Sequence, residues 1–442
     1  MSIPVVTVGA GQAELVGSLE RLHGPVTVVR RCSELAELVA ACQTGLARAA
    51  VIAGATQEVT ATLVDRLGAV GVALVGLTDD DAERVRLAGL GVLAASEAVP
   101  AQELARLIGQ AVEAAAALGP GRPGSSFALA GAPPTFGADA DADADAEDPE
   151  EGPEPGELGQ IIAVWGPIGS PGRTTIAVNC AAELAADGRS VILVDADTYG
   201  SSVAAALGLL DDSAGLAQAC RLADQGLLDR ASLERVASPV VTGAGTLRVL
   251  TGLTRADRWP ELRAAAFGSV LERCRELAEF VVVDPGFCLE ADEELSFDTM
   301  APRRNGAALR ALELADRVLA VGSADSIGMP RLVRALADLE QAVPGAVPTV
   351  VFNRLRASAV GRFPERALRD AWERFGPGLP IAAMVPHDAE AADAALLAGQ
   401  VLLEAAPESA MRHSIAELVC APRQRNRRFA GLRAKAGSAA PR

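Results

Sequence analysis

The sequence of 442 residues contains almost no lysine, because Lys435 is the only one and arginine carries nearly all of the positive charge. Aromatic residues are also scarce, at 3%, whereas half of the chain is apolar. The hydrophobic cores are therefore expected to consist of Ala, Val and Leu. A chain of this length exceeds one ordinary domain, which favours two domains joined by linkers.

The seven cysteines are scattered along the chain, and none forms a C-x-x-C pair. This odd, unclustered set argues against a disulfide framework or a zinc site and indicates reduced thiols in a cytosolic protein. The sequence has no run of about twenty uncharged apolar residues. Its first residues, MSIPVVTVGAG, lack the basic region and long apolar core of a signal peptide. These features predict a cytoplasmic location without a membrane span.

The formal net charge of −17 argues against a protein that coats nucleic acid, which needs clustered cations. Ten carboxylates lie within residues 139–157, so the rest of the chain is only mildly acidic. They belong to residues 119–158, where repeated Asp, Pro and Gly predict a disordered acidic linker. Residues 422–442 are strongly basic and are predicted as a disordered tail. This tail either stays solvated or attaches electrostatically to anionic lipid or DNA.

Residues 1–118 alternate five short β-branched runs with helical stretches. This alternation is typical of a doubly wound α/β domain with a parallel sheet. The predicted strands are Pro4–Val8, Val26–Val29, Ala49–Ile52, Val72–Leu77 and Gly91–Ala94. A second α/β domain is predicted over residues 159–421, where seven apolar runs form a parallel sheet covered on both faces. Ligands of such a sheet bind beyond the carboxyl ends of its strands.

The segment GPIGSPGRTT, residues 166–175, follows an apolar run and precedes a predicted helix over Arg173–Ala186. It partly matches the phosphate-binding pattern G-x-x-x-x-G-K-[ST], with Gly172 in place, Arg173 at the lysine position and Thr174 at the hydroxyl position. Backbone N–H groups and the helix N-terminus of such a loop hold phosphates, and its hydroxyl binds Mg²⁺. The strand–loop–helix context favours a nucleotide site.

Acidic residues stand at the ends of two further predicted strands. Asp195 and Asp197 follow the strand Ser190–Val194, and Asp284 follows the strand Phe280–Val283. A single carboxylate at such a position is often only a helix cap or a solvated turn. Three of them together with a glycine loop indicate a nucleotide site instead.

The glycine loop is followed along the chain by LVDADTYGSSVAAALGL, VVVDPG, VFNR and MVPHDAEAADAALLAGQ. In these motifs and their order, the second domain resembles the MinD/ParA ATPases, which are P-loop NTPases with a deviant Walker A loop (SIMIBI class). Residues 1–118 resemble a response-regulator receiver domain without its chemistry, because the acidic pair, the phospho-accepting Asp and the lysine are missing. With this pseudo-receiver in front, the whole chain resembles the CpaE/TadZ branch, which positions pilus-assembly and secretion machinery.

The resemblance implies that the protein binds ATP and Mg²⁺, forms a homodimer and recruits protein partners through the pseudo-receiver. It implies that Thr174 ligates Mg²⁺ and that Asp195 and Asp284 support the ion through water. In the same way, Asp197 is expected to orient the attacking water as the catalytic residue.

The resemblance also implies a set of nucleotide-binding residues. In that family, Asn353 would read the adenine edge, whereas the segment from Pro386 to Asp388 would wall the base. The full implied set is Gly169, Ser170, Gly172, Arg173, Thr174, Thr175, Asn353, Arg354, Pro386 and Asp388.

Four positions of the loop depart from the family pattern K-G-G-x-G-K-T. Ile168 replaces the signature lysine, which reaches the nucleotide of the other subunit, and it supplies neither charge nor a side-chain hydrogen bond. Ser170 replaces the second glycine, Pro171 removes a backbone N–H, and Arg173 is a bulkier planar cation than lysine. The Arg-Arg-Asn segment at 303–305 is either a source of a replacement cation or an ordinary helix start.

These departures predict that ATP is bound but hydrolysed slowly or not at all, because a trans-acting cation is worth about 10³–10⁵ in rate. The leading hypothesis is therefore a cytoplasmic spatial regulator, located at the inner face of the membrane if its basic tail binds lipid. Two alternatives stay open: a nucleotide-free pseudo-NTPase scaffold, and an active ParA-type partition ATPase whose tail binds DNA.

Overall fold

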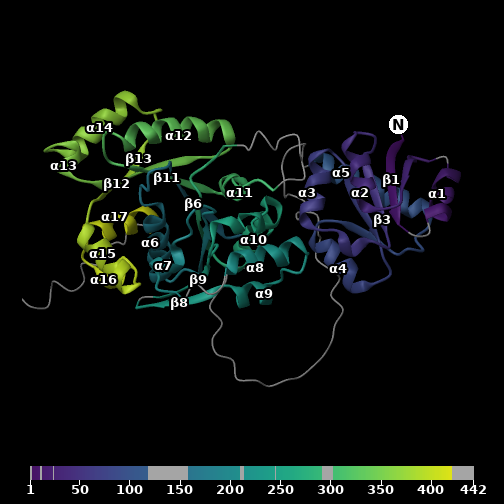
Figure 1. The fold of residues 1–442 in the computed structure, drawn as a ribbon, viewed down its shortest axis with the longest axis horizontal. Helices are drawn as coiled ribbons and strands as arrows, with labels where there is room; N and C mark the ends of the chain where they lie inside the picture. Colours follow the sequence, from purple (N-terminus) through teal and green to yellow (C-terminus); the bar gives the residue numbers. More distant parts are fainter. Residues whose placement is uncertain are drawn as a thin grey trace, which may run out of the picture.

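The computed structural model describes residues 2–9, 12–22, 24–117, 158–209, 214–243, 245–290 and 302–420 (Figure 1). The predicted acidic linker lies outside these residues except for Leu158, and the predicted basic tail lies outside them entirely. Among the helices of the described ranges, none is long and apolar enough to cross a membrane. The fold class is α/β, with two parallel-sheet units, as the sequence predicts.

The N-terminal part is built on a five-stranded parallel sheet with the strand order β2-β1-β3-β4-β5, which is the flavodoxin-like order. The central strands β3 and β4 are buried at every position, which explains their uninterrupted apolar sequences. Helices α2, α3 and α4 cover one face, and α1 and α5 cover the other. The strands are β1 (Ile3–Gly9), β2 (Val26–Cys32), β3 (Ala49–Ala53), β4 (Ala73–Leu77) and β5 (Leu93–Ala95). The helices are α1 (Gln12–Arg21), α2 (Leu35–Gln43), α3 (Ala61–Ala69), α4 (Asp81–Gly89) and α5 (Ala101–Ala117).

The C-terminal part is built on an eight-stranded sheet with the order β13-β12-β11-β6-β10-β7-β9-β8. Its seven predicted strands are all present and parallel, but the sequence analysis missed β8, which pairs antiparallel with β9. The sequence of β8, SPVVT, contains a proline, and its residues are mostly exposed or partly buried. Both features are typical of a strand at the edge of a sheet, whereas a central strand is a continuous apolar run. The strands are β6 (Gln160–Trp165), β7 (Val191–Ala196), β8 (Ser238–Thr242), β9 (Gly245–Leu250), β10 (Phe280–Pro285), β11 (Arg317–Ser323), β12 (Pro348–Leu355) and β13 (Ile381–Pro386).

Helices cover both faces of this larger sheet (Figure 1). One face carries α6 (Arg173–Ala186), α7 (Val203–Ala206), α15 (Ala389–Ala398), α16 (Leu402–Ala405) and α17 (Ala410–Val419). The other carries α8 (Gly215–Asp224), α9 (Arg230–Val236), α10 (Ala264–Leu277), α11 (Gly306–Leu314), α12 (Gly328–Ala342) and α14 (Pro364–Phe375), with α13 (Ala357–Val360) before the last.

Helix α6, which follows the glycine loop, is the most deeply enclosed helix of its face. It is buried without interruption from Ile176 to Ala185, and its small side chains let the neighbouring helices approach closely. Two polar residues inside it are fully paired. The carboxylate of Glu183 accepts two hydrogen bonds from Arg412 of α17, at 2.6 and 2.7 Å. The side-chain amide oxygen of Asn179 accepts the backbone N–H of Leu402 at 2.7 Å. These contacts connect α6 to the start of α16 and to α17.

The two parts touch through α3 and α4 of the first and α8 and α10 of the second (Figure 1). The backbone N–H and the hydroxyl of Thr62 both donate to the same carboxylate oxygen of Asp224, at 3.0 and 2.6 Å. One nitrogen of the Arg86 guanidinium donates to the carbonyl oxygen of Gln225 at 2.9 Å. These polar contacts connect segments more than a hundred residues apart in the sequence.

Candidate functional site

The loop of residues 166–175 joins β6 to α6 and adopts an uncommon backbone. Gly169, Ser170 and Gly172 have φ values of 114°, 51° and 94°, so three loop residues lie in the region that favours glycine. A Cβ at Gly172 would lie 2.3 Å from the amide nitrogen of Asn353, so close packing also demands glycine there. Ser170 is one of two described residues other than glycine with positive φ, a form of strain that is concentrated at functional sites.

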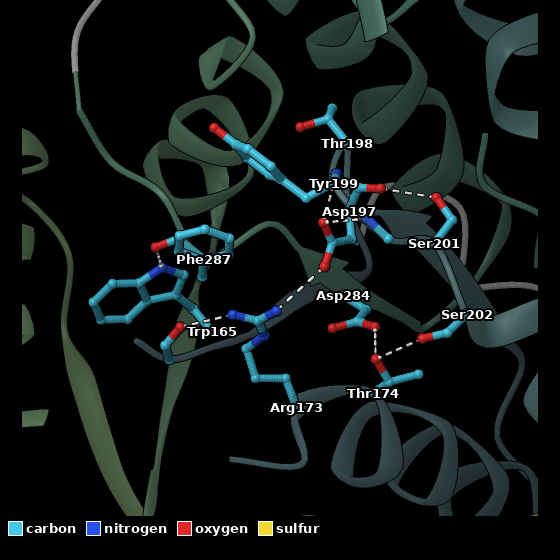
Figure 2. A network of polar contacts seen from close by, with 12 residues as sticks. Trp165, Arg173, Thr174, Asp197, Thr198, Tyr199, Ser201, Ser202, Asp284 and Phe287 are labelled. Carbon is cyan, nitrogen blue, oxygen red and sulfur yellow. Dashed lines mark hydrogen bonds and ion pairs between the residues drawn. The ribbon is translucent and has the colours of Figure 1, made fainter. Parts of the chain in front are cut away.

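Arg173, at the lysine position of the loop, contacts the loop itself and the turn after β7 (Figure 2). Its guanidinium donates to the carbonyl oxygen of Gly166 at 2.9 Å and pairs with the carboxylate of Asp197 at 3.2 Å. The ring of Phe287 lies 5.7 Å away. Only 11% of the Arg173 side chain and 9% of the Asp197 side chain are exposed. The loop cation therefore neutralises a buried carboxylate in this conformation.

The three predicted carboxylates meet because β7 and β10 are neighbours and place Asp195 opposite Asp284 in the register. Burial raises the pKa of Asp195 to about 6, against hydrogen bonds from the backbone N–H groups of Val203 and Asp197. Burial also raises the pKa of Asp284 to about 8, and the charge of Asp195 adds to this effect. A cluster of buried acids with raised pKa values is destabilised unless a cation neutralises it.

Asp284 has one satisfied and one unsatisfied oxygen. Its Oδ2 accepts the hydroxyl of Thr174 at 2.6 Å, whereas its Oδ1 is buried without a hydrogen-bond partner. The hydroxyl of Ser202 donates to the Thr174 oxygen at 3.3 Å (Figure 2). Hydroxyl and carboxylate oxygens are the ligands that Mg²⁺ takes, usually together with several waters. The described residues contain no group of three or more His, Cys, Asp or Glu side chains that could hold a metal ion by themselves. The arrangement thus fits a Mg²⁺ ion bound by few direct protein ligands.

Both carboxylate oxygens of Asp197 accept hydrogen bonds. Oδ1 accepts the backbone N–H groups of Tyr199 and Gly200, at 2.8 and 3.2 Å, and Oδ2 receives Arg173. The predicted water-orienting residue therefore stabilises the turn after β7 in this structure. Arg304, one of the two candidates for a replacement cation, packs 3.9 Å from the Tyr199 ring centroid, and its guanidinium donates to the carbonyl oxygen of Thr198. Arg304 therefore contacts the same turn as Asp197.

A pocket of about 330 Å³ opens beside the loop, at the carboxyl ends of β12 and β13. Its lining residues are Gly172, Thr175, Asn353, Arg354, Arg356, Pro386, His387, Asp388, Ala389, Ala392, Asp393 and Met411. Six predicted nucleotide-binding residues, Gly172, Thr175, Asn353, Arg354, Pro386 and Asp388, thus surround one pocket. Of the other four, Arg173 and Thr174 contact the carboxylates of Asp197 and Asp284, and Gly169 and Ser170 lie in the loop before them.

Asn353, the predicted reader of adenine, is 2% exposed and holds the loop to β12. Its amide nitrogen donates to the carbonyl oxygen of Pro171 at 2.8 Å, and its oxygen accepts the backbone N–H of Arg354 at 2.8 Å. Arg354 itself has a φ of 60°. Asn353 thus connects the loop to β12 at the wall of the pocket.

Sequence reasoning missed several residues at the site. Ser202 approaches Thr174, and its backbone N–H donates to Asp195 at 2.9 Å, a contact across a turn that no spacing rule identifies. Arg356 and Asp393 line the pocket without belonging to a recognisable motif. Their positions depend on how β12 and α15 pack, so neither carried a sequence signal. His387, which also lines the pocket, belongs to the segment that was predicted to wall the base.

Residues 162–398 match the family model described as the CobQ/CobB/MinD/ParA nucleotide binding domain. Solved structures with a similar fold include the cell division ATPase MinD of Pyrococcus furiosus, with 19% identity, 59% of this chain and 97% of that chain covered, and a TM-score of 0.46. They also include a ParA family ATPase from Chlorobium tepidum TLS, with 18% identity, coverage of 59% and 98%, and a TM-score of 0.46. A third is the septum site-determining protein MinD complexed with Mg-ADP from Pyrococcus horikoshii OT3, with 19% identity, coverage of 59% and 95%, and a TM-score of 0.46. A comparison with curated proteins found no match.

Proposed function

The chain belongs to the CobQ/CobB/MinD/ParA nucleotide-binding family, and from this premise we propose that it binds ATP with Mg²⁺ and hydrolyses it slowly or not at all. One observation carries the proposal. Gly172 and Thr175 line the pocket, while Thr174 between them donates to the buried Asp284. The start of α6 therefore faces a base-sized cavity on one side and an acidic cluster on the other. A phosphate chain lying over this helix N-terminus connects the two.

Mg²⁺ in this site would be held by the hydroxyl of Thr174, with Asp284 and Asp195 supporting it through water. The ion supplies positive charge that neutralises the phosphate oxygens. The unpaired Oδ1 of Asp284 supports this assignment, because a buried carboxylate oxygen without a partner is costly and an ion or its water satisfies it. The pKa values of Asp195 and Asp284 are raised in the absence of Mg²⁺, because the two carboxylates are buried close to each other.

Two features of the site favour slow turnover. Both oxygens of the Asp197 carboxylate already accept hydrogen bonds, one from Arg173 and the other from two backbone N–H groups, so a water molecule would have to compete with these contacts. Ile168, which is 61% exposed, supplies no charge where the related loops carry lysine. Because phosphoryl transfer depends on charge stabilisation and positioning, these changes reduce hydrolysis more than binding.

The proposed biological role is that of a spatial regulator similar to the CpaE/TadZ branch, which acts as a dimer and recruits proteins through its N-terminal part. The flavodoxin-like strand order supports a pseudo-receiver. The strand ends that carry receiver chemistry have no carboxylate here, because β1 ends at Gly9 and β3 ends at Ala53 and is followed by Gly54. This part therefore offers surfaces and no phosphorylation site. A cytoplasmic location and contact of residues 422–442 with membrane or DNA remain parts of the same proposal.

Titration of the purified chain with a fluorescent ATP analogue, with and without Mg²⁺, tests the nucleotide function. We expect saturable binding that is strengthened by Mg²⁺ and weakened in Thr174→Ala. Thr349→Ala, at the other end of β12 from Asn353, is the matched control and should bind like the natural chain. Absence of saturable binding would favour the nucleotide-free scaffold. Steady phosphate release that Asp197→Ala abolishes would instead favour an active ATPase.

A further inference from the structure

The loop lacks its signature lysine, yet an arginine from a distant helix lies over it. Arg331 belongs to the first turn of α12, and its guanidinium covers Gly169, the residue after Ile168. A Cβ at Gly169 would lie 2.6 Å from the Arg331 Nη1 atom, so the guanidinium occupies the space that a side chain at 169 would need. The cation therefore reaches the loop next to the position where charge is missing.

The placement of α12 is fixed by the strands beneath it. β11, which leads into α12, pairs with β6, which leads into the loop. The carboxylate of Asp325 caps α12 by accepting the backbone N–H groups of Ile327 and Gly328, at 3.0 and 2.7 Å. The N-terminal amides of α12 are thus already used internally. The positive charge that α12 brings to the loop is that of the Arg331 side chain.

Unlike Arg173 and Arg304, Arg331 has no side-chain hydrogen bond or ion pair to any other residue that the structure describes. Arg173 is paired with Asp197, and Arg304 is packed on Tyr199 and bonded to Thr198. Across the part of the chain that the structure describes, the Arg331 guanidinium makes no hydrogen bond or ion pair, and the residue is exposed. An unengaged arginine over a glycine-rich phosphate loop is arranged to receive an anion.

We propose that Arg331 binds the terminal phosphate of a nucleoside triphosphate and so replaces, from within the same chain, the charge that Ile168 lacks. The inference rests on the proposed nucleotide function and makes it more specific. The pocket adjoins Gly172 and Thr175, whereas Arg331 lies over Gly169 at the other end of the loop. A phosphate chain starting at the pocket brings its last phosphate, and not its first, toward this arginine. Arg331 therefore selects triphosphate over diphosphate.

The test compares ATP, ADP and inorganic tripolyphosphate as ligands of the full chain, by calorimetric titration in the presence of Mg²⁺. Arg331→Ala should weaken ATP and tripolyphosphate binding by about tenfold or more and leave ADP binding within about threefold, because a charge-assisted hydrogen bond to the last phosphate is lost. Arg331→Lys should recover part of the ATP affinity. Arg334→Ala, one turn further along the exposed side of α12, is the control and should bind all three ligands unchanged.

Unchanged ATP affinity in Arg331→Ala would overturn the inference, as would an equal loss of ATP and ADP, which indicates a structural role. Melting curves of the variants show whether each is folded. If the natural chain binds tripolyphosphate through Arg331 but not ATP, the nucleotide function fails while the anion site stands. If it binds ATP without any preference over ADP, the nucleotide function stands and the role of Arg331 fails. Binding of neither ligand refutes both.

Discussion

Replacement of Asp284 by asparagine should stabilise the protein in EDTA at neutral and alkaline pH while abolishing its response to Mg²⁺. The side chain is 1% exposed, one of its oxygens is unpaired, and burial raises its pKa from an ordinary value of 3.8 to about 8. The folded protein therefore holds this proton to a higher pH than the unfolded chain does. As a result, the free energy of unfolding falls as the pH rises from about 4 to about 8.

The size of the effect follows from these two pKa values. Keeping Asp284 in the folded protein costs about 2 kcal/mol at pH 5 and about 5 kcal/mol at pH 8, relative to a group that does not titrate. Asparagine preserves an acceptor for the Thr174 hydroxyl, but its buried amide nitrogen lacks a partner, which costs about 1–3 kcal/mol at every pH. Asp284→Asn should therefore be within about 1 kcal/mol of the natural chain at pH 5 and about 2–4 kcal/mol more stable at pH 8.

Urea denaturation in EDTA at pH 5 and pH 8, followed by circular dichroism, measures this difference. Addition of Mg²⁺ at pH 8 should raise the urea midpoint of the natural chain and leave that of Asp284→Asn unchanged, since ligands stabilise only the state that binds them. Glu234→Gln, an exposed carboxylate change on α9, controls for the altered net charge. A stability difference that is the same at both pH values would refute the reasoning, because an uncharged cause would then dominate.

Three further predictions concern the loop and the contact between the two parts. Arg173→Ala breaks a buried ion pair and should lower the free energy of unfolding of the nucleotide-free protein by about 3–5 kcal/mol, measured by the same denaturation. Gly172→Ala should cost about 2 kcal/mol or more and weaken ATP binding, because its Cβ would displace the Asn353 amide. Gly188→Ala, with a similar φ of 84° but open space around it, should cost less and leave ATP binding unchanged. Asp224→Ala removes the acceptor for two hydrogen bonds from α3 and should make the N-terminal part more susceptible to limited proteolysis, with ATP affinity retained.

Much of the fold could be predicted from the sequence, because buried parallel strands are continuous apolar runs that local composition makes visible. All seven predicted strands of the larger sheet are present. The strand that was missed, β8, lies at the edge and is partly exposed, so its sequence lacks the apolar signal and contains a proline. Its identity as a strand depends on β9 beside it, a neighbour that the local pattern does not specify.

The residue pattern was enough to predict that the glycine loop and the carboxylates lie together, because the carboxyl ends of neighbouring parallel strands share one edge of a sheet. Glycine spacing before a helix and acids after two strands were enough to place Thr174, Asp195 and Asp284 together. The contacts that these groups make with one another could not be predicted in this way. The pairing of Arg173 with Asp197, the hold of Asn353 on Pro171 and the approach of Arg331 to Gly169 each join distant segments. Such contacts depend on side-chain directions and helix placement, which packing settles and linear spacing does not.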